Sequence, residues 1–163
     1  TAAETTTEAA TEAATEAVER NYSPEEGTGW LVVEINGTPV EFEFTGSTKG
    51  MAGQAYSFEA DEYTMTLMLN KALKVGEEMD GNAITQIEIV SSETSSVGYY
   101  FIKKSPSKKV DSKVTLAENE NEKVTQAEFS AVVPTAERYV GDNKPGILPQ
   151  LELTEGEFCF CEK

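Results

Sequence analysis

The chain has 163 residues, of which 39% are hydrophobic, and it carries a formal net charge of −16 without any histidine. This length favours one domain or a domain with an appendage, and the negative charge disfavours binding to nucleic acid or to anionic membrane surfaces. We therefore expect no nucleic-acid partner. Because histidine is the commonest general base and metal ligand, its absence leads us to expect no cofactor. No apolar run is long enough for a transmembrane segment, so we expect no membrane span.

The N-terminal segment, residues 1–21, is a spacer rich in Thr, Ala and Glu, in which Glu recurs every four residues from Glu4 to Glu16. On a helix these carboxylates would form one self-repelling stripe, and no apolar stripe is present to dock such a helix. The segment is therefore predicted to be a frayed helix or disordered, and to act as a stalk or as an inert tail. We expect residues before about Tyr22 to be dispensable for folding. Because the chain begins at Thr1 rather than at Met, we expect that a preceding segment, such as a signal peptide, has been removed, either by processing or by the choice of the expressed segment.

The strongest local signal is a β-hairpin near the start of the remaining chain. Residues 31–35 and 40–44 alternate in hydrophobicity, and Asn36 and Gly37 lie between them. Asn and Gly tolerate the positive φ angles that a type I′ turn requires. The pattern therefore predicts two antiparallel strands joined at Asn36-Gly37.

The alternation also predicts the faces of the second hairpin strand. Phe42 and Phe44 should lie in the core, and Glu41 and Glu43 should face solvent. Pro39 has no amide hydrogen to donate, so we expect it at the start of its strand or on the unpaired side.

Further strands are predicted at short, regular intervals between turn-forming segments. They cover residues 55–60, 63–69, 84–90, 98–102, 113–116, 124–133, 151–154 and 157–161. Nine or ten short strands without a convincing helix are typical of a sandwich or a barrel. We predict that residues 22–163 form a single antiparallel β-sandwich, with a closed lipocalin-like β-barrel as the alternative.

The closing strand has a near-copy earlier in the chain, since residues 124–130 resemble residues 153–159. The similarity predicts a β-bulge at Ala127 and another at Gly156. The acidic leader, the Asn-Gly hairpin and the closing Leu151-Glu152-Leu153-Thr154-Glu155-Gly156-Glu157-Phe158 strand together resemble exported β-sandwich lipoproteins of bacteria. The resemblance implies an extracytoplasmic location, either anchored at the cell surface or secreted. It lies in the overall pattern, so it assigns no site residue.

The two cysteines are placed two residues apart in the last strand. Cys159 and Cys161 should share one face of it, and Phe158 and Phe160 the other. A zinc site needs more ligands than two thiolates, and a disulfide would be strained in an extended segment. We expect both thiols to be reduced, partly buried and free of metal, with a redox role as the alternative.

Two other kinds of segment invite a ligand interpretation. The glycine-rich loop at 46–53 lacks the Gly-Lys-Ser/Thr sequence of a phosphate-binding loop, so it is predicted to be a hairpin connection. Acidic loops at 61–62, 77–82 and 118–122 carry oxygen ligands for calcium but show no EF-hand spacing. They are predicted to be solvated loops.

Candidate binding residues come from one basic segment and from three aromatic side chains. Five of the eleven lysines lie within eleven residues, namely Lys103, Lys104, Lys108, Lys109 and Lys113. Such a segment can contact an anionic glycan or wall polymer, although lysines also protect exposed edge strands from unwanted pairing. The aromatic candidates are Trp30, Tyr99 and Tyr100, because alternation explains their positions least, and exposed Trp and Tyr rings stack on sugars or anchor protein partners.

These observations favour a non-enzymatic module of a bacterial cell envelope, outside the cytoplasm, that binds a ligand or serves in surface display. Its partner would be a glycan, a wall polymer or a surface protein. The first alternative is a small-ligand carrier of the lipocalin type, which requires an apolar cavity inside a barrel. A hydrolase without histidine ranks third, because buried carboxylates can perform acid–base chemistry.

Overall fold

The computed structural model describes residues 20–50, 53–91, 98–102, 111–134 and 150–163, and for 98–102 it describes the backbone alone. The leader up to residue 19 and Lys103, Lys104, Lys108 and Lys109 lie outside these residues. Within the described ranges there are ten strands and no helix, so the all-β prediction is confirmed. A helix with the length and hydrophobicity for a membrane crossing is likewise absent from these ranges.

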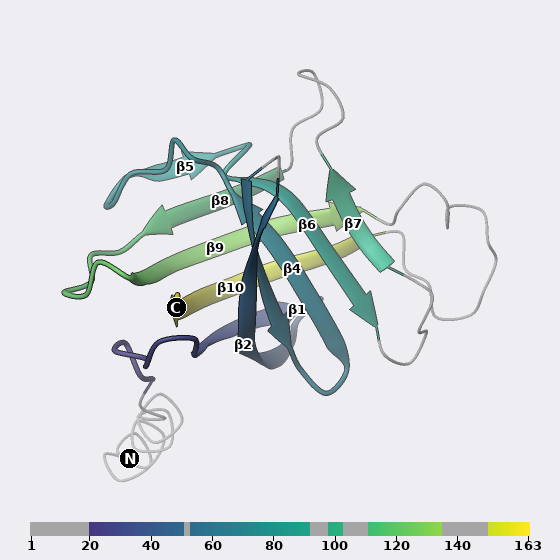
Figure 1. The fold of residues 1–163 in the computed structure, drawn as a ribbon. Coiled ribbons are helices and arrows are strands. Elements are labelled where there is room, and N and C mark those ends of the chain that lie inside the picture. Colours follow the sequence, from purple (N-terminus) through teal and green to yellow (C-terminus); the bar gives the residue numbers. More distant parts are fainter. Residues whose placement is uncertain (1–19, 51–52, 92–97, 103–110, 135–149) are drawn as a thin grey trace, which may run out of the picture.

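All ten strands belong to one sheet and pair with their neighbours in antiparallel fashion (Figure 1). In the order of the chain they are β1 (Gly29–Ile35), β2 (Thr38–Gly50), β3 (Gly53–Glu59), β4 (Tyr63–Leu69), β5 (Glu78–Asp80), β6 (Ile84–Ser91), β7 (Gly98–Ile102), β8 (Asp111–Leu116), β9 (Val124–Pro134) and β10 (Gln150–Cys161). Their order in the sheet is β5-β8-β9-β10-β1-β2-β3-β4-β6-β7. The last strand of the chain therefore lies in the middle of the sheet, between β9 and β1.

The sheet curls so that its two ends face each other. β4 and β6 cross β9 and β10 at a steep angle in Figure 1, and β6 and β7 contact β8 and β9. Irregularities in register, such as the one between Phe44 and Gly46, are the kind of bulge that bends a strand. One hydrogen bond links the two ends directly, since the amide of Ile84 in β6 donates to the hydroxyl of Ser112 in β8 at 3.0 Å.

The hairpin at the start of the domain is confirmed. Asn36 and Gly37 have φ angles of 49° and 85°, and Ile35 pairs with Thr38 across the turn. Pro39 is the second residue of β2, where this strand pairs with β1 and has not yet met β3. A bulge occurs next to the position predicted at Gly156, since the β9–β10 register shifts between Leu153 and Gly156 while Gly156 itself pairs with Phe129.

The bulge predicted at Ala127 is absent. Ala127 pairs in regular register with Phe158 on one side and with Leu116 on the other. A strand held between two neighbours in register has no room for an unpaired residue. The similarity of the two segments therefore did not extend to their backbone geometry.

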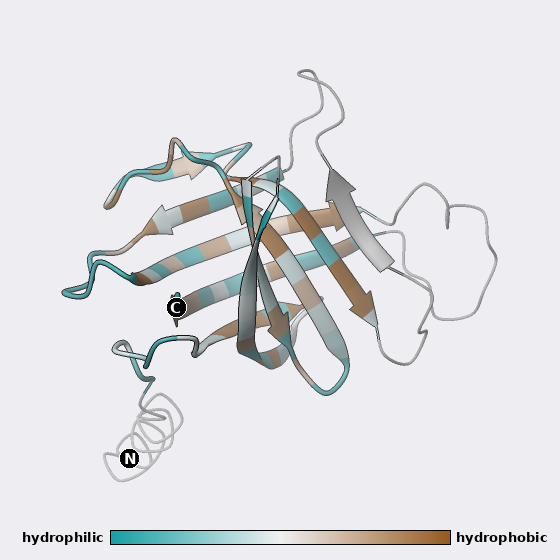
Figure 2. Ribbon diagram, viewed as in Figure 1, coloured by the Kyte–Doolittle hydropathy of each residue, from teal (hydrophilic) through white to brown (hydrophobic). Residues whose placement is uncertain are grey.

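The concave face of the sheet encloses the core. Hydrophobic and polar residues alternate along the strands in Figure 2, and Phe42 and Phe44 are buried while Glu41 and Glu43 are exposed, as predicted. The centre is an aromatic cluster in which Phe160 stacks on Phe44 with ring centroids 4.6 Å apart. The other rings of the cluster are Tyr56, Phe58, Phe129 and Phe158. These rings fill the space between the two halves of the sheet.

Candidate functional site

The convex face of the sheet is partly covered by a strap, which we define as residues 20–28. The strap is held to β10 by backbone hydrogen bonds, from the Gly27 amide to the Cys161 carbonyl at 2.8 Å and from the Cys161 amide to the Thr28 carbonyl at 2.9 Å. The Asn119 side chain donates to the Tyr22 carbonyl at 2.7 Å. Pro24, within the strap, is buried. The strap is thus part of the folded domain.

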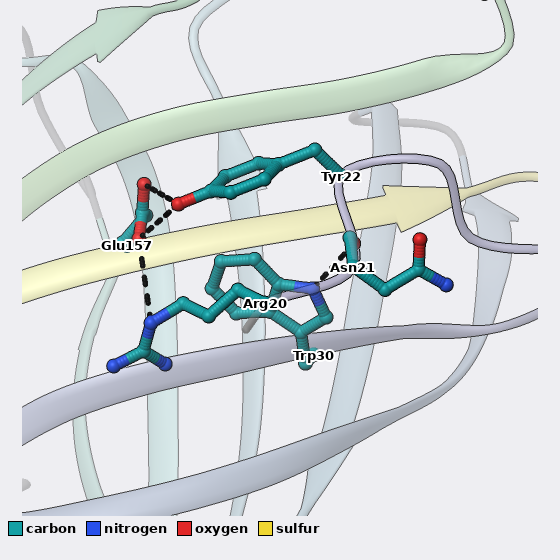
Figure 3. A network of polar contacts seen from close by, with 5 residues as sticks. All are labelled: Arg20, Asn21, Tyr22, Trp30 and Glu157. Carbon is teal, nitrogen blue, oxygen red and sulfur yellow. Dashed lines mark hydrogen bonds and ion pairs between the residues drawn. The ribbon is translucent and has the colours of Figure 1, made fainter. Parts of the chain in front are cut away.

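Arg20 and Asn21, which the sequence assigned to the spacer, belong to this strap (Figure 3). The indole nitrogen of Trp30 donates to the Asn21 carbonyl at 2.8 Å. The guanidinium carbon of Arg20 lies over the Trp30 ring, 5.2 Å from its centroid. For residues 1–19, which lie outside the described ranges, dispensability for folding stays a prediction.

Trp30 is half-buried, so it is neither a free platform nor a core residue. Arg20 covers its face, and Tyr22 meets it edge-on with ring centroids 5.5 Å apart and planes at 78°. A cation over a tryptophan face is attracted by the electrons of the ring. Trp30 thus already serves as a binding surface, and its occupant is a side chain of the same protein.

Glu157 on β10 completes this network. One of its oxygens lies 3.8 Å from Nε of Arg20, and both accept hydrogen bonds from the Tyr22 hydroxyl, at 3.0 and 3.2 Å. Partial burial raises the pKa of the Tyr22 phenol, and the hydrogen bond and charge of Glu157 raise it further. The side chains of Trp30 and Glu157 therefore form a site for a guanidinium.

The two cysteines lie on this same convex face, under the strap. Cys159 and Cys161 form a small buried cluster with Val124, against which Trp30 packs, and both thiols are free. Burial, followed by the charges of Glu157 and Cys161, raises the pKa of Cys159 to about 11. The predicted division of β10 into a cysteine face and a phenylalanine face is confirmed, and the thiols are fully rather than partly buried.

Beside the strap, the convex face is hollowed by a groove of about 920 Å³. We call it the β1–β2 groove, since most of its lining comes from these two strands. The strap, Glu59 at the end of β3, and the turn between β3 and β4 supply the rest. The lining residues are Arg20, Asn21, Gly29, Trp30, Val32, Thr38, Pro39, Val40, Glu41, Phe42, Glu43, Glu59, Ala60, Asp61 and Glu62. Among the described residues that line it, five are carboxylates and Arg20 is the one cationic side chain.

The sheet register explains how these carboxylates come together. Glu43 of β2 lies directly between Trp30 of β1 and Glu59 of β3, and Glu41 lies on the same face one step along β2. Like charges directly opposite each other on neighbouring strands are destabilising. None of the ion pairs between described residues involves Glu41, Glu43 or Glu59. The fold therefore holds repelling carboxylates together in the groove.

A second, smaller hollow of about 410 Å³ lies across β8, β9 and β10. Lys113 lines it and pairs with Asp80 of β5 at 3.8 Å. Glu128 and Glu157 lie opposite each other there. Of the predicted binding residues with described side chains, Lys113 and Trp30 thus line different hollows.

For the other predicted binding residues, the structure describes at most the backbone. Tyr99 and Tyr100 belong to β7, where their backbones pair with Ile89 and Glu88. Lys103, Lys104, Lys108 and Lys109 lie outside the described residues. Sequence reasoning missed the groove carboxylates, because alternation marks a residue as outward-facing without showing which outward residues share a hollow.

The described residues contain no group of three or more acidic or cysteine side chains arranged to hold a metal ion. In the acidic loop at 118–122, two side-chain oxygens accept hydrogen bonds from backbone amides. Asn119 accepts from the Asn121 amide, and Asn121 accepts from the Lys123 amide, each at 3.0 Å. These two oxygens stabilise the loop conformation.

No protein-family model, curated protein or solved structure matches this chain. The functional argument therefore rests on the geometry of the convex face, above all on the groove beside Trp30.

Proposed function

We propose that this chain is a non-enzymatic binding module that works outside the cytoplasm of a bacterium and takes its ligand in the β1–β2 groove. The observation that carries the proposal is the half-buried Trp30 beside an open groove with five carboxylates. An aromatic ring held by its neighbours offers a large contact area at little entropic cost. A glycan, a wall polymer or a surface protein would each fit such a surface.

The exposure of the groove favours binding over catalysis. Acid–base catalysis by paired carboxylates depends on an environment that separates their pKa values, usually by burying one of them. Glu41, Glu43 and Glu59 are all exposed to solvent. An open polar surface of this kind suits reversible recognition.

The architecture is best interpreted as a sandwich made from two halves of one curled sheet, in preference to a closed carrier barrel. The edge strands β5 and β7 are not neighbours in the sheet, and aromatic rings such as Phe58 and Phe160 occupy the interior. A lipocalin-like carrier needs an apolar cavity in that place. These features support a module that binds through its outer surface.

The location outside the cytoplasm is supported by the sequence pattern of the leader, which resembles the spacers of exported bacterial lipoproteins. The leader runs directly into the strap, and the strap borders the groove. The groove would therefore lie next to the point where the leader enters the domain, at Arg20.

A binding screen tests the proposal. Wild-type protein would be assayed against glycan arrays, isolated wall polymers and surface polypeptides at low and moderate salt. Trp30→Ala would remove the aromatic ring, and Val75→Ala would serve as control, since Val75 is an exposed apolar residue that does not line the groove. We expect at least one ligand that Trp30→Ala loses and Val75→Ala retains.

Two results would overturn the proposal. One is the absence of any ligand that depends on Trp30. The other is robust hydrolysis of a polysaccharide or peptide by the wild type, abolished by changing a single carboxylate, which would make the protein an enzyme.

A further inference from the structure

The strap shows which chemistry the convex face recognises. Arg20 lies over the ring of Trp30 and within 3.8 Å of Glu157. This combination of an aromatic face and a carboxylate is well suited to a guanidinium, which stacks on rings and pairs with carboxylates at the same time. The structure thus contains a cation site already occupied by an arginine.

The same chemistry continues beyond Arg20, where none of the described residues supplies a cation. Glu43 lies next to Trp30 in register, and Glu59 lies next to Glu43. Residues opposite each other on neighbouring strands have Cβ atoms about 5 Å apart. The groove therefore carries a row that starts at an occupied cation site and continues with carboxylates that no described lysine or arginine neutralises.

We propose that the β1–β2 groove docks an arginine-bearing segment of a partner polypeptide, and that Arg20 occupies one of its cation sites until the partner binds. The inference rests on the proposed function and names its ligand class. The partner would place one guanidinium between Trp30 and Glu157, displacing Arg20, and others on Glu43 and Glu59. Two cations then relieve the repulsion between neighbouring carboxylates, so they gain more there than on an isolated Glu.

The spacing of the row suits an extended polypeptide. Alternate residues of an extended segment lie on the same face, about 7 Å apart. Because Arg side chains are long and flexible, two of them at this spacing can both reach Glu43 and Glu59, whose Cβ atoms are about 5 Å apart. Arginine is preferred over lysine because its planar guanidinium stacks on Trp30 and is weakly hydrated. A peptide of alternating Gly and Arg is therefore the simplest probe.

The net charge of −16 attracts any cation, so the test needs controls matched in charge. The probe is a fluorescent peptide with four Gly-Arg repeats, and its dissociation constant is measured by anisotropy at about 50 mM and 150 mM salt, on either side of the range where screening becomes strong. The groove variant is Glu43→Gln with Glu59→Gln. The control is Glu118→Gln with Glu120→Gln, which removes the same charge from an exposed loop outside the groove.

We expect the groove variant to weaken peptide binding about fivefold to tenfold, as two partly exposed ion pairs would, and the loop variant to weaken it less than about twofold. Both variants should unfold at or above the wild-type temperature, since each removes neighbouring like charges. Equal weakening by the two variants would mean that the peptide follows net charge, and the inference would be wrong.

Competition by Arg20 gives a second readout. Arg20→Ala should tighten peptide binding about threefold relative to Lys74→Ala, a control that removes one positive charge from an exposed loop. A peptide of Gly-Lys repeats should bind several-fold more weakly than the Gly-Arg peptide. If Arg20→Ala does not tighten binding beyond its control, Arg20 does not occupy the ligand site.

The outcomes also separate this inference from the broader proposal. If the Gly-Arg peptide does not bind but another ligand depends on Trp30, the proposed function stands and the polypeptide inference fails. If no ligand depends on Trp30, both fail. Spermine binding as tightly as the peptide, with the same loss in the groove variant, would show that the groove selects small polycations and would overturn the choice of a polypeptide.

Discussion

The two faces of β10 are equally buried but are covered in different ways. Phe158 and Phe160 on the concave face and Cys159 and Cys161 on the convex face are all at most 1% exposed. The phenylalanines pack against rings from β2, β3 and β9. The cysteines are covered from outside by Trp30 and the strap, a single segment without regular secondary structure.

This difference means that the concave face stabilises the fold, whereas the cover of the convex face can open. The concave face is covered by strands that the whole sheet holds in place, so uncovering it requires global unfolding. The strap is held by a few hydrogen bonds and by the contacts of Arg20 and Tyr22, so it can open locally at lower cost. The convex face, which carries the groove, is therefore the part of the molecule that can change when a partner arrives.

The largest effect is expected in the aromatic core. Phe44→Ala removes a ring that stacks on Phe160 at 4.6 Å, and truncating a buried aromatic side chain typically costs about 3 to 5 kcal/mol. Glu43→Ala, one residue away on the exposed face, should change the free energy of unfolding by less than about 0.5 kcal/mol. Urea unfolding measures both. Similar losses in the two variants would show that the register of β2 is misassigned.

The next effect concerns the close approach of β1 to β10. A Cβ atom added at Gly29 would lie 2.3 Å from the Cβ of Phe160 and 2.5 Å from its Cα, so Gly29→Ala must push the strands apart. Overpacking of this kind costs about 1 to 3 kcal/mol. Gly50→Ala is the matched control, because its added Cβ would meet nothing closer than 3.8 Å. Thermal unfolding should separate the two variants, and equal melting temperatures would contradict the close approach.

The buried thiol of Cys159 is expected to lower the free energy of unfolding by about 1 kcal/mol at alkaline pH. The pKa of Cys159 is about 11 in the folded protein and 9.0 in its reference state. Between these values the unfolded chain loses a proton that the folded chain keeps, so the thiol does not affect stability below pH 9 and lowers it as the pH rises toward 11. At pH 10 the loss is about 1 kcal/mol.

Comparison with Cys159→Ala isolates this contribution. Urea unfolding at pH 7.5 and pH 10 should show a smaller loss between the two pH values for the variant than for the wild type. The raised pKa of Tyr56 acts in both proteins and cancels, as does the small cavity left by the substitution. The raised pKa of Tyr22 cancels except for its smallest cause, the charge of Cys159. Identical losses would mean that Cys159 does not titrate in this range.

Sequence alone predicted what depends on neighbouring residues. The turn at Asn36-Gly37, the burial of Phe44 and the separation of Cys159 from Phe158 all follow from alternation and turn chemistry, and all are present. These features need no knowledge of which strands pair, because the two faces of a strand are determined by its own pattern.

The features that were not predicted depend on long-range pairing. Alternation does not reveal that β10 lies between β9 and β1, and this placement brings Glu157 beneath Arg20. The strap was assigned to the spacer up to residue 21, because its contacts are made by single polar and aromatic side chains without periodicity. The candidate site was thus predictable only as one residue, Trp30.

The smallest effect on stability tests whether the strap opens locally. Tyr22→Phe removes the hydrogen bond from the phenol to Glu157 and keeps the ring that meets Trp30. A hydrogen bond of this kind contributes about 0.5 to 1.5 kcal/mol, so the melting temperature should fall by only a few degrees.

The labelling rate of Cys159, measured with a thiol reagent in a Cys161→Ala background, should rise about threefold to tenfold, because the strap covers this thiol. Tyr56→Phe is the control, since it removes a hydroxyl from a ring on the other side of the sheet, against Phe160. An unchanged labelling rate in Tyr22→Phe, or an equal rise in the control, would mean that Cys159 is reached through global unfolding and that the strap is as firmly held as the core.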